Sequence, residues 1–208
     1  MKYLFLILCT FSLIGKEPHP TIKVNKWLSD EKELTEGRFF KLASLATVDS
    51  SGHPHSRIIE IIQFTQSKGA LFFTHENTNK VKDLSYNPHT ALNIYLPRTH
   101  RQMCIEGVVE PASFEEAEKA WKKMPRYMKV TFMCSKVGET LESQSILETR
   151  KKEIEKEYPT EIPCPPYFVG YYLKPKEIIF YESHHRSFPV KEIAILEKEE
   201  WISKLVEP

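Results

Sequence analysis

The segment from Leu42 to Phe64 constrains the fold more than any other part of the chain. Residues 42–48 form a short apolar run, and residues 54–64 form a second run that is rich in isoleucine. Between them, Asp49-Ser50-Ser51-Gly52 has the composition of a tight turn, because glycine adopts positive φ without steric cost. Since β-branched residues favour strands, the segment predicts a β-hairpin.

Similar short runs recur along the rest of the chain. We expect strands at 70–74, 90–96, 101–110, 168–173, 177–181 and 193–196, and a last strand at 201–206 that pairs with its predecessor. Helices are expected at 27–36, at 80–86 behind capping residues 77–79, from 113 to about 124, and at 143–158. Ser113 and Glu116 have the spacing of a capping box. Short strands joined by tight turns predict an antiparallel barrel with outer helices, in one domain over residues 21–208.

Composition excludes several classes of partner. The formal net charge is +1, so no global field attracts nucleic acid or an anionic membrane. None of the four cysteines forms a Cys-x-x-Cys pair, which argues against a zinc site or a disulfide framework. The adjacent histidines His184 and His185 are typical of a solvated turn. We therefore expect no metal, no nucleic acid and no stable membrane span.

The N-terminus carries an apolar run, Tyr3–Ile14, behind Lys2. The pattern resembles a secretory signal, although Gly15 is the sole candidate for a small cleavage residue. About a dozen residues are too few to span a bilayer as a helix. Export through residues 1–15, an unprocessed leader of a cytoplasmic protein, and a start codon placed too early all fit. In each case we expect residues 1–20 to lie outside the fold.

Three polar features have the residue types that chemistry requires. Arg57 stands in an otherwise apolar strand, where an exposed arginine is the commoner interpretation. Thr74, Thr78 and Lys80 surround a junction between a strand and a helix, where hydroxyls, a lysine and free N–H groups suit a phosphate; a plain capped helix fits equally well. Gln102 begins the next strand, either as a surface residue or as a partner for a flat heterocycle.

The order of these features resembles the pyridoxamine 5′-phosphate oxidase family. Gly52-x-Pro54-x-Ser56-Arg57 closely resembles the first hairpin of that family, and Phe72-Phe73-Thr74 resembles its Phe-Tyr-Thr segment. Lys80 matches the lysine of its Ser-Arg-Lys phosphate motif, with Thr78 in place of the serine. Further matches continue to the end of the chain, so the resemblance extends over about residues 25–208.

The resemblance implies a split β-barrel that forms a homodimer and binds flavin mononucleotide (FMN) at the interface, with both subunits contributing to each site. It implies oxidation of an amine or alcohol substrate, such as a phosphorylated B6 vitamer, with electrons passing through FMN to oxygen. It also implies a set of flavin contacts and one substrate contact, Arg186. The flavin contacts would be Arg57, Ile58, Phe73, Thr74, Thr78, Lys80, Gln102 and Tyr181.

Departures from the family pattern cluster at the substrate. Ile62, Ala120, Met124 and Met128 stand where the family has the lysine, tyrosine, arginine and serine that clamp the substrate phosphate. Each lost charge-assisted bond weakens binding by on the order of a kcal/mol. The nearby basic residues Arg126 and Lys129 are a potential replacement, although solvated side chains are the simpler interpretation. Other departures concern the flavin and the late basic motif: Asn79, Val137-Gly138, Tyr181, Phe188 and Val190.

Three functions therefore compete. The first is an FMN-dependent oxidoreductase whose substrate differs from pyridoxamine phosphate. The second is a non-catalytic dimer that holds flavin, haem or another flat ligand. The third is a structural dimer with an empty site. The sequence favours them in that order and does not identify a substrate.

Overall fold

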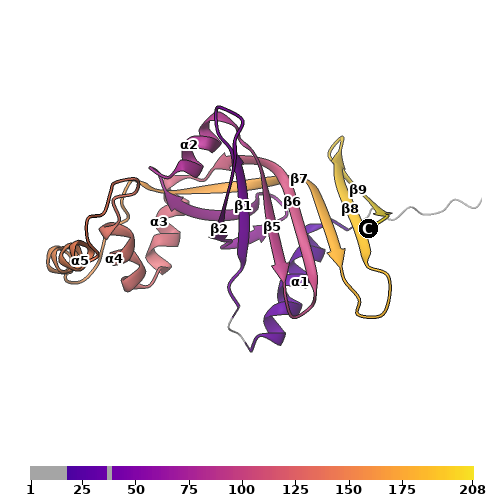
Figure 1. Ribbon diagram of the computed structural model, residues 1–208, viewed down its shortest axis with the longest axis horizontal. Coiled ribbons are helices and arrows are strands. Elements are labelled where there is room, and N and C mark those ends of the chain that lie inside the picture. Colours follow the sequence, from indigo (N-terminus) through magenta and orange to yellow (C-terminus); the bar gives the residue numbers. More distant parts are fainter. Residues whose placement is uncertain (1–17, 37–38) are drawn as a thin grey trace, which may run out of the picture.

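The computed structural model describes residues 18–36 and 39–208, and it is mostly β (Figure 1). Apart from residues 18–20, the expected N-terminal leader lies outside the described residues. The strands are β1 (Leu42–Val48), β2 (Pro54–Glu60), β3 (Gln63–Thr65), β4 (Gly69–His75), β5 (His89–Leu96), β6 (Arg101–Pro111), β7 (Phe168–Glu182), β8 (Val190–Glu197) and β9 (Glu200–Val206).

The strands form one antiparallel sheet in the order β2-β1-β5-β6-β7-β4-β3, and the β8–β9 hairpin pairs with the far half of β7. Strands β2 and β3 are the two ends of this order but are consecutive in the chain, and the sheet curls to bring them together. The backbone N–H of Ile61 donates to Lys41 O, and that of Ile62 donates to Leu71 O, each at 2.8 Å. The chain thus changes partner from β1 to β4 at these two residues and closes the barrel. The predicted mainly β, split-barrel fold is confirmed.

Helices lie outside the sheet. They are α1 (Thr21–Leu34), α2 (Asn79–Tyr86), α3 (Phe114–Lys123), α4 (Arg126–Cys134) and α5 (Ser145–Glu157). Figure 1 shows α3, α4 and α5 at one end of the molecule and the β8–β9 hairpin at the other. The barrel interior holds one core, which includes Leu45, Phe72 and Met103. A second core lies between α3, α4 and β7, around Trp121 and Phe168.

Three expected strands had wrong bounds. The run expected over 54–64 stops at Glu60, because residues 61–62 make the change of partner described above. The strands expected at 168–173 and 177–181 are one strand, β7, which passes through Pro175 without breaking. Pro175 lies at a bulge, where the register with β6 shifts between Glu106 and Gly107. A side chain at Gly107 would begin 2.0 Å from Lys174 O, so glycine permits this close approach.

Two helices also differ from expectation. Helix α1 begins at Thr21 rather than at Trp27, because the ring of His19 accepts from the Thr21 backbone N–H at 3.3 Å and lies 2.8 Å from its hydroxyl. Helix α4 was not expected, since its run of aromatic and β-branched residues has a composition typical of strands. The capping box at Ser113 is confirmed.

Glu116 links this capping box to the sheet. Its carboxylate accepts from Lys68 Nζ at 2.6 Å, from the Ser113 backbone N–H at 2.9 Å and from the Tyr172 hydroxyl at 2.8 Å. The bond from Lys68, followed by those from Ser113 and Tyr172, lowers the pKa of Glu116 from 4.5 to about 2. The charged form is therefore the one that stabilises the fold.

Replacing Glu116 should make the free energy of unfolding less sensitive to pH in the acidic range. A carboxyl group whose pKa is lowered by folding stabilises the protein above its unfolded pKa, and this contribution is lost as pH falls toward the folded pKa. We expect Glu116→Gln to lower the free energy of unfolding by about 1–2 kcal/mol at pH 7. The difference from wild type should shrink between pH 4.5 and about 2, as measured by urea denaturation. Glu115→Gln, an exposed neighbour, should stay close to wild type; an equal loss for Glu116→Gln at pH 7 and at pH 2 would contradict the assignment.

Candidate functional site

A cavity of about 650 Å³ lies where the end of β4, the start of α2 and strand β2 meet. It is open to solvent, and most of its lining is polar or basic. The lining residues are Arg57, Asn77, Thr78, Asn79, Lys80, Lys82, Val137, Gly138 and Glu139. We call this cavity the cradle.

Three cations line the cradle, and two of them, Arg57 and Lys80, interact electrostatically. Lys80 Nζ donates to the Thr74 hydroxyl at 3.0 Å, and it has no carboxylate partner in the described part of the chain. Burial lowers the pKa of Lys80, and the positive charge of Arg57 lowers it further. Two like charges held close in a partly buried site repel each other, and an anion between them would relieve that repulsion.

The first turn of α2 adds unpaired donors to the cradle. The backbone N–H groups of Asn79 and Lys80 have no acceptor among residues 18–36 and 39–208. The expected side-chain cap does not form, and the Thr78 hydroxyl donates to His75 O at 3.0 Å. Free N–H groups at a helix N-terminus attract anions. The cradle thus combines three cations, free backbone donors and the Thr78 side chain.

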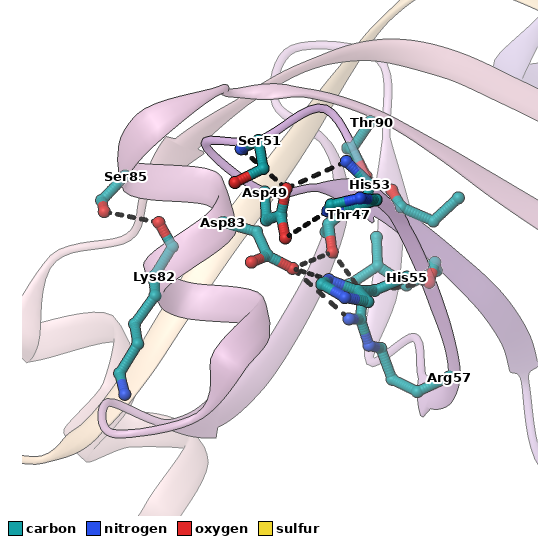
Figure 2. Close-up of polar contacts among 12 residues, drawn as sticks. Thr47, Asp49, Ser51, His53, His55, Arg57, Lys82, Asp83, Ser85 and Thr90 are labelled. Atoms are coloured by element: carbon teal, nitrogen blue, oxygen red, sulfur yellow. Dashed lines mark hydrogen bonds and ion pairs between the residues drawn. The ribbon is translucent and has the colours of Figure 1, made fainter.

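Asp83, on α2, positions Arg57 (Figure 2). This carboxylate is buried on α2 and accepts from the Thr47 hydroxyl at 2.6 Å and from His55 Nδ1 at 3.1 Å. Arg57 Nη2 lies 3.6 Å from the same oxygen, and Arg57 Nη1 donates to the Thr47 hydroxyl at 2.6 Å. Burial by itself raises the pKa of Asp83, but the bonds from Thr47 and His55 and the charge of Arg57 hold it below its usual value. Asp83 therefore stays ionised and fixes the guanidinium.

The other expected flavin contacts lie elsewhere on this chain. Gln102 and Tyr181 are directly opposite each other on β6 and β7, on the outer face of the sheet. Ile58 follows Arg57 in the strand and points to that same outer face, 65% exposed. Phe73 points away from Thr74 and stacks on Phe168 with ring centroids 5.0 Å apart.

The chain thus brings together four of the expected residues, Arg57, Thr74, Thr78 and Lys80. Arg186, expected to contact substrate, is exposed in the loop between β7 and β8. The roles of Ile58, Phe73, Gln102, Tyr181 and Arg186 remain predictions.

The four substituted clamp positions divide between two further cavities. Ile62 and Ala120 line one of about 310 Å³, beside Phe73 and Tyr172. Met124 and Met128 line another of about 380 Å³, which shares Val137 with the cradle. We call this second one the methionine cavity. It escaped prediction because α4, which forms much of its wall, was not expected.

Sequence reasoning also missed Thr47, His55 and Asp83. The alternation of His55 and Arg57 on one face of a strand was a usable signal, but nothing in the sequence indicated that Asp83 of a polar helix would be buried against them. Among the described residues, no group of three or more histidine, cysteine or acidic side chains could hold a metal ion. No helix in residues 18–36 and 39–208 is long and apolar enough to cross a membrane.

Comparison with known proteins decides the family. The family model described as pyridoxamine 5′-phosphate oxidase matches residues 31–157, more than half of the chain. The chain belongs to the pyridoxamine 5′-phosphate oxidase family. Pyridoxine/pyridoxamine 5′-phosphate oxidases of Burkholderia mallei and Burkholderia thailandensis are each 32% identical to it over 167 residues, covering 79% of this chain and 76% of theirs.

Solved structures share the fold of this chain. PhzG from Burkholderia lata, solved with tetrahydrophenazine-1-carboxylic acid, has a TM-score of 0.84 and 24% identity, covering 92% of this chain and 94% of its own. A pyridoxamine 5′-phosphate oxidase-related, FMN binding protein from Nostoc punctiforme has a TM-score of 0.74 and 16% identity, covering 93% of this chain and all of its own. At these identities the likeness concerns the fold. This family member therefore has a split barrel, with its cradle at the junction of β4 and α2.

Removing the charge of Asp83 should destabilise the protein. In Asp83→Asn the amide keeps one acceptor, but Arg57 loses its ion-pair partner in a partly buried site. We expect the free energy of unfolding to fall by about 1–3 kcal/mol, measured by urea denaturation at pH 7. Asp49→Asn is the matched control, because Asp49 accepts two backbone N–H groups in an exposed turn. Equal losses in the two variants would show that the buried network does not hold Arg57.

Proposed function

We propose that this family member binds FMN and oxidises a small amine or alcohol substrate, with electrons passing through the flavin to oxygen. The cradle is the observation that carries this proposal. Arg57 and Lys80 line one cavity, where the charge of Arg57 acts on Lys80, beside free N–H groups at the start of α2. That arrangement is suited to a phosphate monoester, and FMN carries one. Membership of the family supplies the flavin as the candidate ligand.

The residues present fit the phosphate end of FMN. Arg57 would give charge-assisted bonds from a guanidinium that Asp83 already orients, so little side-chain entropy is lost on binding. Lys80 is held by Thr74 and would contribute a second charge. The N–H groups of Asn79 and Lys80 would bind the remaining phosphate oxygens. Glu139 also lines the cradle, but its carboxylate lies 3.8 Å from Lys136 Nζ.

These contacts indicate what FMN and the chain would each contribute to the reaction. When bound, FMN supplies the redox chemistry, as acceptor of a hydride equivalent from the substrate. The chain would anchor the phosphate and thereby set the position of the flavin ring. None of the residues in the cradle is required to exchange a proton with substrate, which is consistent with a protein whose contribution is orientation and electrostatics.

The outer face of the sheet supports a homodimer as part of the proposal. Gln102 and Tyr181 lie in one row with Tyr95, which is 60% exposed. Leu42 and Ile58 add exposed apolar surface to the same face. Because this face points away from the cradle of its own chain, Gln102 and Tyr181 would reach a flavin only in a second copy. A dimer through this face would both cover the apolar residues and complete two sites.

A non-catalytic protein that holds flavin or another flat ligand is the second candidate. The neutral residues at Ile62, Ala120, Met124 and Met128 favour it, since they offer no charge to a phosphorylated substrate. They also count against a phosphorylated B6 vitamer as substrate for an oxidase. Hydrogen peroxide production from pyridoxamine 5′-phosphate at an ordinary rate would exclude the non-catalytic alternative.

Neutralising Arg57 or Lys80 in the cradle should weaken FMN binding. We expect Arg57→Gln and Lys80→Gln each to raise the Kd for FMN at least tenfold, which corresponds to about 1.4 kcal/mol. Binding would be followed by quenching of flavin fluorescence and by the visible absorption spectrum. Lys152→Gln, an exposed lysine on α5, is the control and should bind like wild type. The proposal fails if wild-type protein leaves the flavin spectrum unchanged, or if all three variants bind equally.

Charging the outer face should separate the subunits. We expect Ile58→Glu to convert a dimer into a monomer in sedimentation velocity, because a buried unpaired carboxylate destabilises an apolar interface. The monomer should also bind FMN more weakly, since the second subunit's contribution is lost. Ile22→Glu, which charges an exposed isoleucine of α1, should stay dimeric. Finding wild type monomeric in the presence of FMN would refute the proposed assembly.

A further inference from the structure

The methionine cavity has the features of a ligand-binding site, and the proposed function gives it no role. It lies between His75, at the end of β4, and helix α4, and it adjoins the cradle at Val137. Its volume of about 380 Å³ suits a small molecule. The lining residues are His75, Met124, Tyr127, Met128, Thr131, Phe132, Ser135 and Val137.

The lining carries no cation among the described residues. Helix α4 has two basic side chains, and both are engaged elsewhere. Arg126 donates to Thr160 O at 2.8 Å and to Tyr158 O at 2.5 Å. Lys129 is buried with its ammonium 6.0 Å from the centre of the Trp121 ring. They therefore do not replace the charges expected at the clamp, and a dianion in this cavity would lose hydration without a compensating charge.

His75 gives the cavity one defined hydrogen-bond donor. Its Nδ1 accepts from the Asn77 backbone N–H at 3.1 Å, so the neutral ring carries its proton on Nε2. Burial lowers the pKa of His75, which favours this neutral form. The ring is fixed by stacking on Tyr167 and Phe132, with centroids 4.8 and 5.3 Å away.

Two of the other hydroxyls in the lining can act only as acceptors toward a ligand, whereas the Tyr127 hydroxyl can also donate. The Thr131 hydroxyl donates to Tyr127 O at 2.9 Å, and the Ser135 hydroxyl donates to Thr131 O at 3.1 Å. Their hydrogens are therefore occupied. The remaining walls are methionine and aromatic surface, which packs well against the face or edge of a flat ring.

We propose that the methionine cavity binds the substrate, and that this substrate is an uncharged, flat aromatic molecule with a hydrogen-bond acceptor for His75 Nε2 and without a phosphate. The inference rests on the proposed function, because it places the substrate beside a flavin anchored in the cradle. It narrows that function to alcohols carried on an unphosphorylated ring, because an alkylamine is protonated near neutral pH. Neutral lining, a fixed donor and contact with the cradle at Val137 carry it together.

A matched pair of probes tests the proposal directly. The compounds 2-naphthol and 2-naphthyl phosphate share one ring system and differ in the phosphate. We expect 2-naphthol to bind FMN-saturated protein at least tenfold more tightly than 2-naphthyl phosphate, measured by isothermal titration calorimetry. Met128→Arg should reverse this preference by adding a cation to the lining. Leu141→Arg is the control and should keep the wild-type preference, because Leu141 is about as exposed as Met128 (40% and 38%) and lies outside the cavity.

The outcomes separate this inference from the proposed function. Equal or tighter binding of 2-naphthyl phosphate by the wild type would overturn the inference, as would a preference that Met128→Arg leaves unchanged. The change in the flavin absorption spectrum on mixing with protein is read in the same samples and reports on FMN binding independently. Absence of that change without loss of the naphthol preference would refute the flavoprotein proposal and still support a neutral aromatic site.

Discussion

The change of partner at Ile61 and Ile62 is the constraint on which the rest of the structure depends. Strand β2 ends on β1, and β3 begins on β4 two residues later, so one short stretch of backbone joins the two ends of the sheet order. The Ile61 side chain is fully buried, which fixes this corner to the barrel core. The bulge at Gly107 and Pro175, between β6 and β7, lets β7 bend with the curl.

Closure brings distant segments into one site. Helix α2 follows β4, and closure places it against β1 and β2, where Asp83 meets Thr47, His55 and Arg57 (Figure 2). The same placement puts the N-terminus of α2 opposite the Arg57 guanidinium. An ionised Asp83 both fastens the helix to the strands and orients the cation. The Asp83 carboxylate therefore contributes both to the stability of the barrel and to the geometry of the cradle.

The sequence predicted those elements that depend on a few neighbouring residues. Strand β1 and the capping box at Ser113 were predicted because alternation and turn chemistry are properties of a few neighbouring residues. The break after Glu60 and the continuity of β7 through Pro175 depend on pairing partners far along the chain, which no local pattern contains. Arg57 and Lys80 were expected as site residues through the resemblance to the family, whereas the burial of Asp83 became visible only once α2 was docked.

The two cavities differ in how firmly the fold holds their residues. The cradle is built from strand ends and a helix start that barrel closure already positions, so changing it would disturb the barrel itself. The methionine cavity is walled mainly by α4, which packs outside the sheet on the second core. Side chains there can change charge while the barrel, and with it the cradle, is preserved. Under the proposed function, a chain of this family could keep its flavin site and acquire a different substrate, and neutral Met124 and Met128 beside a basic cradle are the arrangement that such a change would produce.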